Sequence, residues 1–141
     1  MAVAAVLVAC ALLVVLTTVL HYEVLRTLNA ALPRVRVRPR AKLVVVILVA
    51  FAAHALEMAL YGVAFWVLVV PLGAGTLSGA HPSFASALYF SAETYTSLGF
   101  GDLTPGGPVR LLAGVEALNG LLLIGWSASF TYLCMERFWA D

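Results

Sequence analysis

Charged residues are scarce in this sequence. Its 141 residues include 8 lysines and arginines and 7 aspartates and glutamates, whereas 63% of the chain is hydrophobic. A soluble domain of this size needs a charged outer shell, which so few charged residues cannot form. The mean hydropathy of +1.03 agrees with burial in lipid. The composition therefore excludes a water-soluble domain and predicts a membrane protein with little mass outside the bilayer.

Cysteine is rare as well. The two cysteines are Cys10 and Cys134. Neither has the spacing of a metal ligand, and nothing implies a disulfide. Residues 7–10 resemble a bacterial lipoprotein cleavage box, but the stretch before Cys10 is too short and has no positive charge to act as a signal. The uncharged run over residues 2–20 also exceeds the apolar core of a signal peptide, so we interpret it as a membrane helix.

Long apolar segments occur three times along the chain. Residues 2–20 contain no acidic or basic residue, residues 43–70 contain two and residues 111–134 contain one. As helices these segments would be about 28, 42 and 36 Å long, against a hydrocarbon core of about 30 Å. The first segment carries no arginine ladder, which disfavours a voltage sensor. We therefore predict an all-α membrane protein with three transmembrane helices.

Six of the eight basic residues lie between the first two apolar segments. The positive-inside rule places this loop in the cytoplasm, so the N-terminus is expected outside the cell and the C-terminus inside. Anionic lipid headgroups are the partners expected for the loop over residues 26–42, and no nucleic-acid partner is expected. The six basic residues are Arg26, Arg34, Arg36, Arg38, Arg40 and Lys42.

A short apolar helix is predicted after the second long segment. Pro71 and Gly73 mark an irregular loop, and Ser83 is a suitable N-cap for a helix over residues 83–96. This helix is too short to span a bilayer, so we expect it to enter partway and turn back. Irregular backbone at membrane depth is tolerated where protein buries it or where it lines a wet cavity. Glycine-rich backbone after such a helix favours a pore.

Two glycines stand two residues apart directly after this helix. Turning several carbonyls toward one axis requires alternating left- and right-handed backbone, which Gly99 and Gly101 adopt without the penalty of a β-carbon. Carbonyls from four chains can replace the water shell of a monovalent cation, and the Ser97 hydroxyl can add an innermost ring of oxygens. The predicted selectivity filter reads Thr96-Ser97-Leu98-Gly99-Phe100-Gly101-Asp102.

This segment resembles the potassium-channel signature Thr-(Thr/Ser)-Val-Gly-Tyr-Gly-Asp. The resemblance extends over roughly residues 43–135 and looks most like the two-helix bacterial channels, in particular the small proteins that add an N-terminal helix. It implies a homotetrameric cation channel of the bacterial inner membrane, not an enzyme, with no cofactor and with K⁺ or Na⁺ as the permeant ion. Leu98 replaces the family's valine and Phe100 its tyrosine, so a non-selective cation channel is an alternative. The implied K⁺ ligands are Ser97, Leu98, Gly99 and Phe100.

The resemblance also implies supporting residues. Tyr89, Glu93 and Asp102 would support the filter, and Gly120 and Gly125 would provide a gating hinge. Glu93 and Asp102 are expected to share a proton, because two neighbouring carboxylates cannot both ionise cheaply behind a filter. The predicted division is an N-terminal helix over 1–25, a basic linker over 26–42, an outer helix over 43–70, a pore helix over 83–96, the filter over 96–102 and an inner helix over 109–134.

Other classes of membrane protein fit less well. The residues 99–102 match the Gly-x-Gly-Asp signature of intramembrane aspartyl proteases, which need a second membrane aspartate. The other aspartate of this chain is Asp141, at its C-terminal end, so we disfavour an enzyme. Potassium transporters usually join four helix–pore–helix repeats in one chain, and this chain has one. A potassium-transporter subunit and a non-conducting membrane scaffold are the further alternatives.

Four polar residues are expected inside the membrane. His54 and Glu57 are three residues apart on one helix, and Glu116 and Asn119 repeat that spacing on another. Unpaired polar groups are costly in lipid, so we predict that the four meet between the second and third membrane helices. A structural network, a proton-sensitive gate and a metal site are all open interpretations of this cluster.

The first helix is expected to be the outermost one. Residues 2–25 show no polar face and are predicted to contact lipid, whereas residues 109–134 are predicted to line an inner cavity. His21 and His81 are expected at opposite membrane interfaces, where a lone histidine needs no functional explanation.

Overall fold

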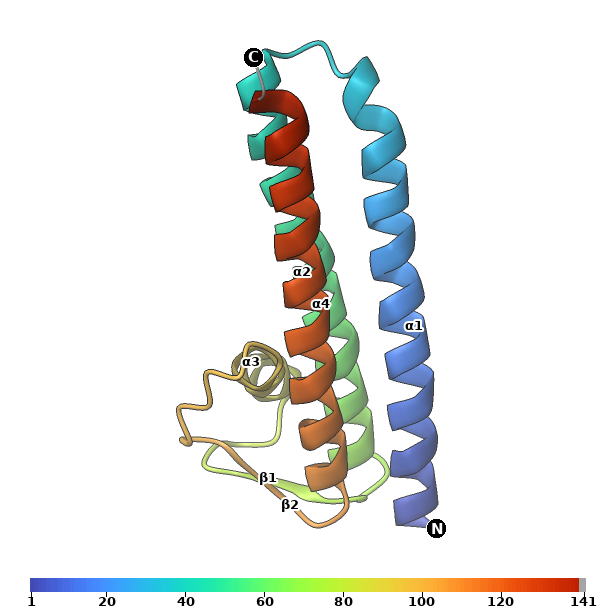
Figure 1. Cartoon of the computed structure of the whole chain (residues 1–141). Coiled ribbons are helices and arrows are strands. Elements are labelled where there is room, and N and C mark those ends of the chain that lie inside the picture. The colour runs from blue at the N-terminus through green and yellow to red at the C-terminus, as the bar shows by residue number, and fades with distance from the viewer. Residues whose placement is uncertain (140–141) are drawn as a thin grey trace.

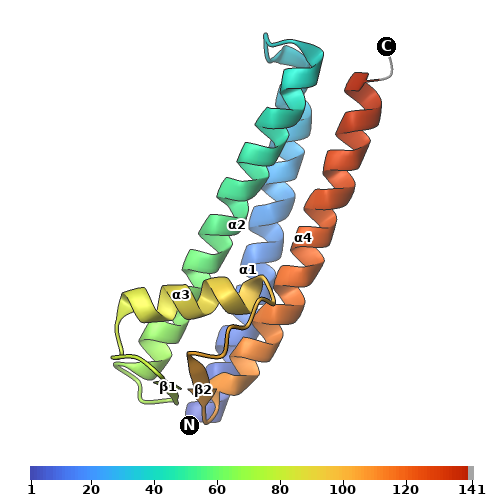
Figure 2. The same ribbon diagram turned by 90° about the vertical axis from the view of Figure 1, so that its left-hand side faces the viewer.

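Three long helices run side by side in a computed structural model that describes residues 1–139 (Figure 1). Each of the three is long and apolar enough to cross a membrane. A fourth, short helix lies across α2 and α4 (Figure 2). Within the described residues the predicted architecture, an all-α membrane protein with three candidate spans, is confirmed. The helices are α1 (Ala2–Ala31), α2 (Pro39–Val69), α3 (Phe84–Tyr95) and α4 (Val109–Trp139).

The connection between α1 and α2 is shorter than the predicted linker over residues 26–42. α1 continues to Ala31, because no helix-breaking residue interrupts it before Pro33, and one 3₁₀ turn, η1 (Leu32–Arg34), follows. α2 begins at Pro39, where proline is favoured because the first-turn N–H would lack a helical partner anyway. This connection and the C-terminal end of α4 lie at the same end of the molecule (Figure 1).

Two short strands close the opposite end of the molecule. The strands β1 (Thr76–Ser78) and β2 (Thr104–Gly106) pair antiparallel, with Leu77 opposite Pro105. β1 belongs to the loop before α3, and β2 follows the predicted filter. Their pairing therefore connects the two loops on either side of α3 and the filter. Gly79 is required here, since its φ is +108° and a β-carbon would lie 1.9 Å from the carbonyl oxygen of Asp102.

The short helix α3 is fixed at both ends. Ser83 caps its N-terminus, as predicted, because the Ser83 side chain accepts a hydrogen bond from the Ser86 backbone N–H at 3.1 Å. Along its length Phe90 packs edge-on against Phe65 of α2, with ring centroids 5.0 Å apart. Gly62 of α2 allows the close approach, since a β-carbon there would lie 3.0 Å from the Leu88 α-carbon.

The helix α1 packs against both α2 and α4 rather than against one of them. Its inner face buries apolar side chains from Val6 to Leu28 and, in the middle, the polar side chains of Thr17 and His21, both 0% exposed. The prediction that the first helix has no polar face is therefore wrong. Residues 3 or 4 apart along the chain form this face, so the two polar residues lie in line with the apolar ones.

Candidate functional site

The backbone of the predicted filter alternates in handedness. Ser97, Gly99 and Gly101 have φ values of +57°, +55° and +80°, whereas Leu98 and Phe100 between them have negative φ. Such alternation turns successive carbonyls toward the same side, which an ordinary strand does not do. Ser97 is the only residue other than glycine with positive φ among those described. The segment therefore has the backbone geometry that a ring of carbonyl ligands requires.

Glu93, near the end of α3, holds the start of this segment. Its backbone carbonyl accepts hydrogen bonds from the amides of Leu98 at 2.9 Å and Gly99 at 3.1 Å. Its carboxylate Oε2 accepts a third hydrogen bond, from the Phe100 amide at 3.2 Å. One residue thus binds three successive filter amides, which fixes the turn from the helix into the filter.

The other two predicted support residues pair with each other. The Tyr89 hydroxyl donates a hydrogen bond to Asp102 Oδ2 at 3.1 Å. Glu93 is 4% exposed, and burial first, then the neighbouring Asp102 carboxylate, raise its pKa. The raised pKa is consistent with a proton held between Glu93 and Asp102, and the proton bridge itself stays a prediction.

The side chains of the filter segment are uncovered in a single chain. Leu98 is 58% exposed and Phe100 is 67% exposed, although both are large and apolar. Phe90 of α3 is buried against Phe65 of α2, and its side chain has no group that could donate a hydrogen bond to the predicted filter.

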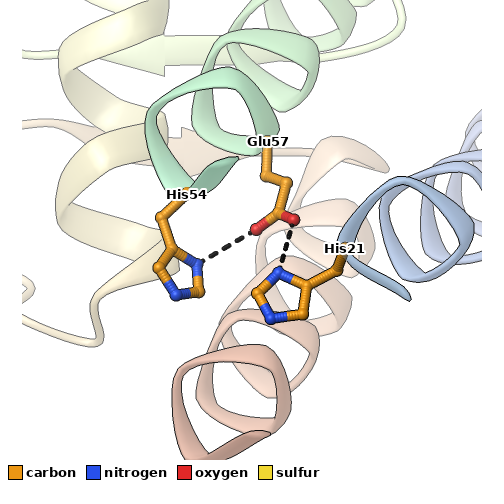
Figure 3. A group of neighbouring side chains, drawn as sticks. All are labelled: His21, His54 and Glu57. Atoms are coloured by element: carbon orange, nitrogen blue, oxygen red, sulfur yellow. Dashed lines mark hydrogen bonds and ion pairs between the residues drawn. The ribbon is translucent and has the colours of Figure 1, made fainter. Parts of the chain in front are cut away.

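A second group of polar side chains lies between the long helices (Figure 3). His54 and Glu57 of α2 meet, as their spacing predicts, with His54 Nδ1 at 3.1 Å from Glu57 Oε2. His21 of α1 joins them, with its Nδ1 at 2.9 Å from Glu57 Oε1. The Tyr95 hydroxyl, at the end of α3, donates to Glu57 Oε2. Ser127 of α4 completes the group through both histidines. We call these five residues the His–Glu cluster.

The placement of His21 at a membrane interface is therefore wrong. Its side chain is fully buried and contacts Glu57, because α1 lies directly against α2. A signal was present in the sequence: Thr17 and His21 are one helical turn apart on the face that also carries Leu13 and Leu25. His81, by contrast, is exposed in the loop before α3.

Glu116 and Asn119 of α4 do not join the His–Glu cluster, so the predicted meeting of four polar residues is wrong in the part of the chain described. Asn119 Nδ2 donates to Thr17 Oγ1 at 2.8 Å and to the Tyr61 hydroxyl at 3.1 Å, which links α4 to α1 and α2. Glu116 Oε1 lies within hydrogen-bond distance of Ser91 Oγ on α3. The four polar residues form separate groups because α1 and α3 supply partners that the predicted cluster did not include.

The proposed hinge glycines lie within one uninterrupted helix. Gly120 and Gly125 are both inside α4, which continues past them to Trp139. Their role as a hinge stays a prediction. The second aspartate considered for protease chemistry, Asp141, lies outside the described residues.

Comparison with known proteins identifies the family of this chain. Residues 41–137 match the model of a family described as ion channel. The inward rectifier potassium channel Kirbac3.1 of Paramagnetospirillum magnetotacticum is 38% identical over 63 residues, which cover 43% of this chain and 21% of that relative. The match thus spans about a fifth of the relative's length. Because the family match covers most of this chain, the chain belongs to this ion-channel family of the potassium-channel superfamily, which is a family of channels rather than of enzymes.

Proposed function

We propose that four copies of this chain form a passive potassium-type channel, with the carbonyls of residues 97–100 lining the ion path. The observation that carries this proposal is the alternating backbone at Ser97, Gly99 and Gly101. Carbonyl rings of this kind replace the hydration shell that a cation loses when it enters the filter. The carboxyl end of α3 leads directly into the filter, and the partial negative charge of a helix C-terminus favours a cation nearby.

The uncovered filter side chains support assembly around an axis. Each described chain supplies one short re-entrant helix and one filter segment, so a closed ring of carbonyls needs several copies. Leu98 and Phe100 are the exposed apolar residues that neighbouring copies would cover. In this arrangement α4, which follows the filter, lines the cavity, and lipids surround the assembly.

The orientation of the chain in the membrane follows from the position of the basic connection between α1 and α2. The connection between α1 and α2 lies at the end opposite to the β-strands and the filter (Figure 1). The positive-inside rule places this connection in the cytoplasm of a bacterial inner membrane, next to anionic headgroups, and the filter toward the outside.

Selectivity for K⁺ over Na⁺ is the finer part of the proposal. Phe100 has no hydroxyl to tether the filter, and the Tyr89 hydroxyl donates to Asp102. A weakly tethered filter favours the second candidate, a non-selective monovalent cation channel. Reversal potentials measured with K⁺ on one side of the membrane and Na⁺ on the other distinguish the two candidate channels. A potential that follows the K⁺ gradient supports K⁺ selectivity. A potential near zero supports the non-selective channel.

Current through purified protein in planar lipid bilayers tests the main proposal. Gly99→Ala and Gly101→Ala should abolish current, because alanine is disfavoured at positive φ although the space beside both glycines is open. Gly114→Ala is the matched control, since it also has open space but lies in a helix with ordinary φ. Full current in both filter variants, or a particle smaller than a tetramer in mild detergent, would contradict the proposal.

A further inference from the structure

We propose that His21, His54 and Glu57 form a binding site for one divalent transition-metal ion of the zinc class. One ligand atom from each residue lies within 4.8 Å of the other two, and the three residues come from α1 and α2 (Figure 3). Two imidazoles and one carboxylate are a ligand set that zinc uses in proteins, with the fourth position left open. The site stands apart from the filter and does not depend on ion conduction.

The distances require little rearrangement. Glu57 Oε1 is 2.9 Å from His21 Nδ1, and Glu57 Oε2 is 3.1 Å from His54 Nδ1. Metal–ligand bonds of about 2.0–2.1 Å in a tetrahedral site place ligand atoms roughly 3.3 Å apart. Each carboxylate oxygen therefore lies about as far from one imidazole nitrogen as two ligand atoms of a metal site lie from each other. The widest separation in the triad, at most 4.8 Å, must close by roughly 1.5 Å, which side-chain rotations supply.

Each of the three ligands has a partner that orients it. Ser127 Oγ lies 3.0 Å from His54 Nε2 and 3.1 Å from His21 Nε2, so one hydroxyl oxygen can accept the N–H groups of both rings. Protons held at both Nε2 atoms leave the lone pairs of both Nδ1 atoms facing Glu57, and the lone pair of His54 Nδ1 also faces the Tyr95 hydroxyl at 2.9 Å. The Tyr95 hydroxyl donates to Glu57 and fixes the carboxylate. Metal sites in proteins are built with such outer hydrogen bonds, which set the tautomer and the orientation of the ligands.

A metal ion would also compensate the Glu57 carboxylate, which lies in an apolar helix where an unpaired charge is disfavoured. The Tyr95 hydroxyl lies 2.9 Å from His54 Nδ1 and also contacts Glu57 Oε2. It would keep its hydrogen bond to Glu57 when the metal takes the lone pair of His54 Nδ1.

Metal binding can be measured on the purified full-length chain in lipid nanodiscs after treatment with a chelator. Co²⁺ is the spectroscopic probe, and Zn²⁺ is added afterwards to displace it. We expect one Co²⁺ per chain with the visible absorption of a four-coordinate site, and loss of that spectrum in His21→Gln and in Glu57→Gln. His81→Gln is the matched control, because His81 is exposed in the outer loop, and it should bind as the wild type does.

Ser127→Ala keeps all three ligands and tests the site without removing any of them. It should weaken Zn²⁺ binding about 10- to 100-fold, as loss of an outer hydrogen bond usually does. Circular dichroism verifies that each variant is folded. Wild-type protein that is folded but binds no Co²⁺ at one equivalent would overturn the proposal. Equal binding by wild type, His21→Gln and Glu57→Gln would overturn it as well. Neither result bears on conduction, which is measured separately.

Discussion

Gly120 of α4 lies against the backbone carbonyl of Tyr95, the last residue of α3. A β-carbon at position 120 would lie 2.2 Å from that oxygen, a distance that no side chain can occupy. The absence of a side chain therefore lets the inner helix touch the end of the short helix directly in front of the filter. The contact with Tyr95 by itself requires glycine at position 120.

Gly120→Ala should accordingly damage the filter region. The added methyl must push α3 away from α4, and overpacking of this kind typically costs about 1–3 kcal/mol. We expect a lower thermal unfolding temperature and loss of current in bilayers. Gly114→Ala, on the same helix, has no neighbouring atom within 4 Å and should change neither measurement. Equal behaviour of the two variants would show that the contact with Tyr95 is unimportant.

Glu93 should make the stability of the protein depend on pH. Burial and Asp102 raise its pKa above the ordinary 4.5, so the folded state binds the proton more tightly than the unfolded state. The resulting stabilisation is complete below the ordinary pKa and is lost as pH rises through the raised value. The unfolding free energy of the wild type minus that of Glu93→Gln should therefore decrease with rising pH.

Glu23→Gln provides the control for that pH series, because Glu23 is exposed and pairs with Arg26 at the surface. In single-channel recordings Glu93→Ala should shorten the time for which the filter conducts, since the amide of Phe100 loses its acceptor. A pH-independent difference between wild type and Glu93→Gln would contradict the assignment of a proton to this carboxyl.

Thr17 should stabilise the attachment of α1. Its hydroxyl accepts the hydrogen bond of Asn119 and donates to the Leu13 carbonyl at 2.8 Å. Thr17→Val keeps the shape and removes both hydrogen bonds, and interhelical hydrogen bonds in membranes contribute about 0.6–1.7 kcal/mol. Reversible unfolding in mixed micelles should show a loss of this size. Thr18→Val, at the neighbouring half-buried position, should have no comparable effect.

Glu116 should be protonated in the folded protein. Ser91 Oγ lies 2.7 Å from the Met58 carbonyl and also contacts Glu116 Oε1, but one hydroxyl hydrogen serves only one of them. If Ser91 donates to Met58, the carboxyl of Glu116 must supply the other hydrogen. Glu116→Gln, which is neutral and can donate, should then change the unfolding free energy by less than about 1 kcal/mol, whereas Glu116→Ala should cost about 2–5 kcal/mol.

Infrared spectroscopy provides a second measurement of Glu116. The wild-type protein should show the carbonyl band of a protonated carboxyl in a dry environment, and Glu116→Gln should lose it. A strongly destabilised Glu116→Gln variant without such a band in the wild type would indicate an ionised Glu116 instead.

The parts of this fold that depend on local sequence could be predicted. The long helices follow from uninterrupted hydropathy, and the position of the short helix follows from Ser83 before an apolar run. The backbone alternation follows from the spacing of Gly99 and Gly101, which concerns neighbouring residues only. The strands β1 and β2 could not be predicted. Each has only three residues, which is too short for a periodic signal, and β2 contains Pro105.

The polar contacts depend on which helices meet, and this is not written locally. His21 and Glu57 are 36 positions apart, and Thr17 and Asn119 are 102 apart. Without knowledge that α1 packs against both α2 and α4, a lone histidine in an apolar run resembles an interfacial residue. The prediction that polar groups in lipid find partners was sound, but it assigned the wrong partners to two of the four residues.

The position of α1 changes what can be regarded as the minimal unit of this protein. The family match begins at residue 41, so it leaves out α1, yet Glu57 and Asn119 inside the matched region complete their hydrogen bonds with side chains of α1. A chain shortened to residues 41–137 would expose these groups to lipid. Properties measured on a chain without such a helix therefore do not describe the interior of this helix bundle, where α1 supplies buried hydrogen-bond partners to α2 and α4.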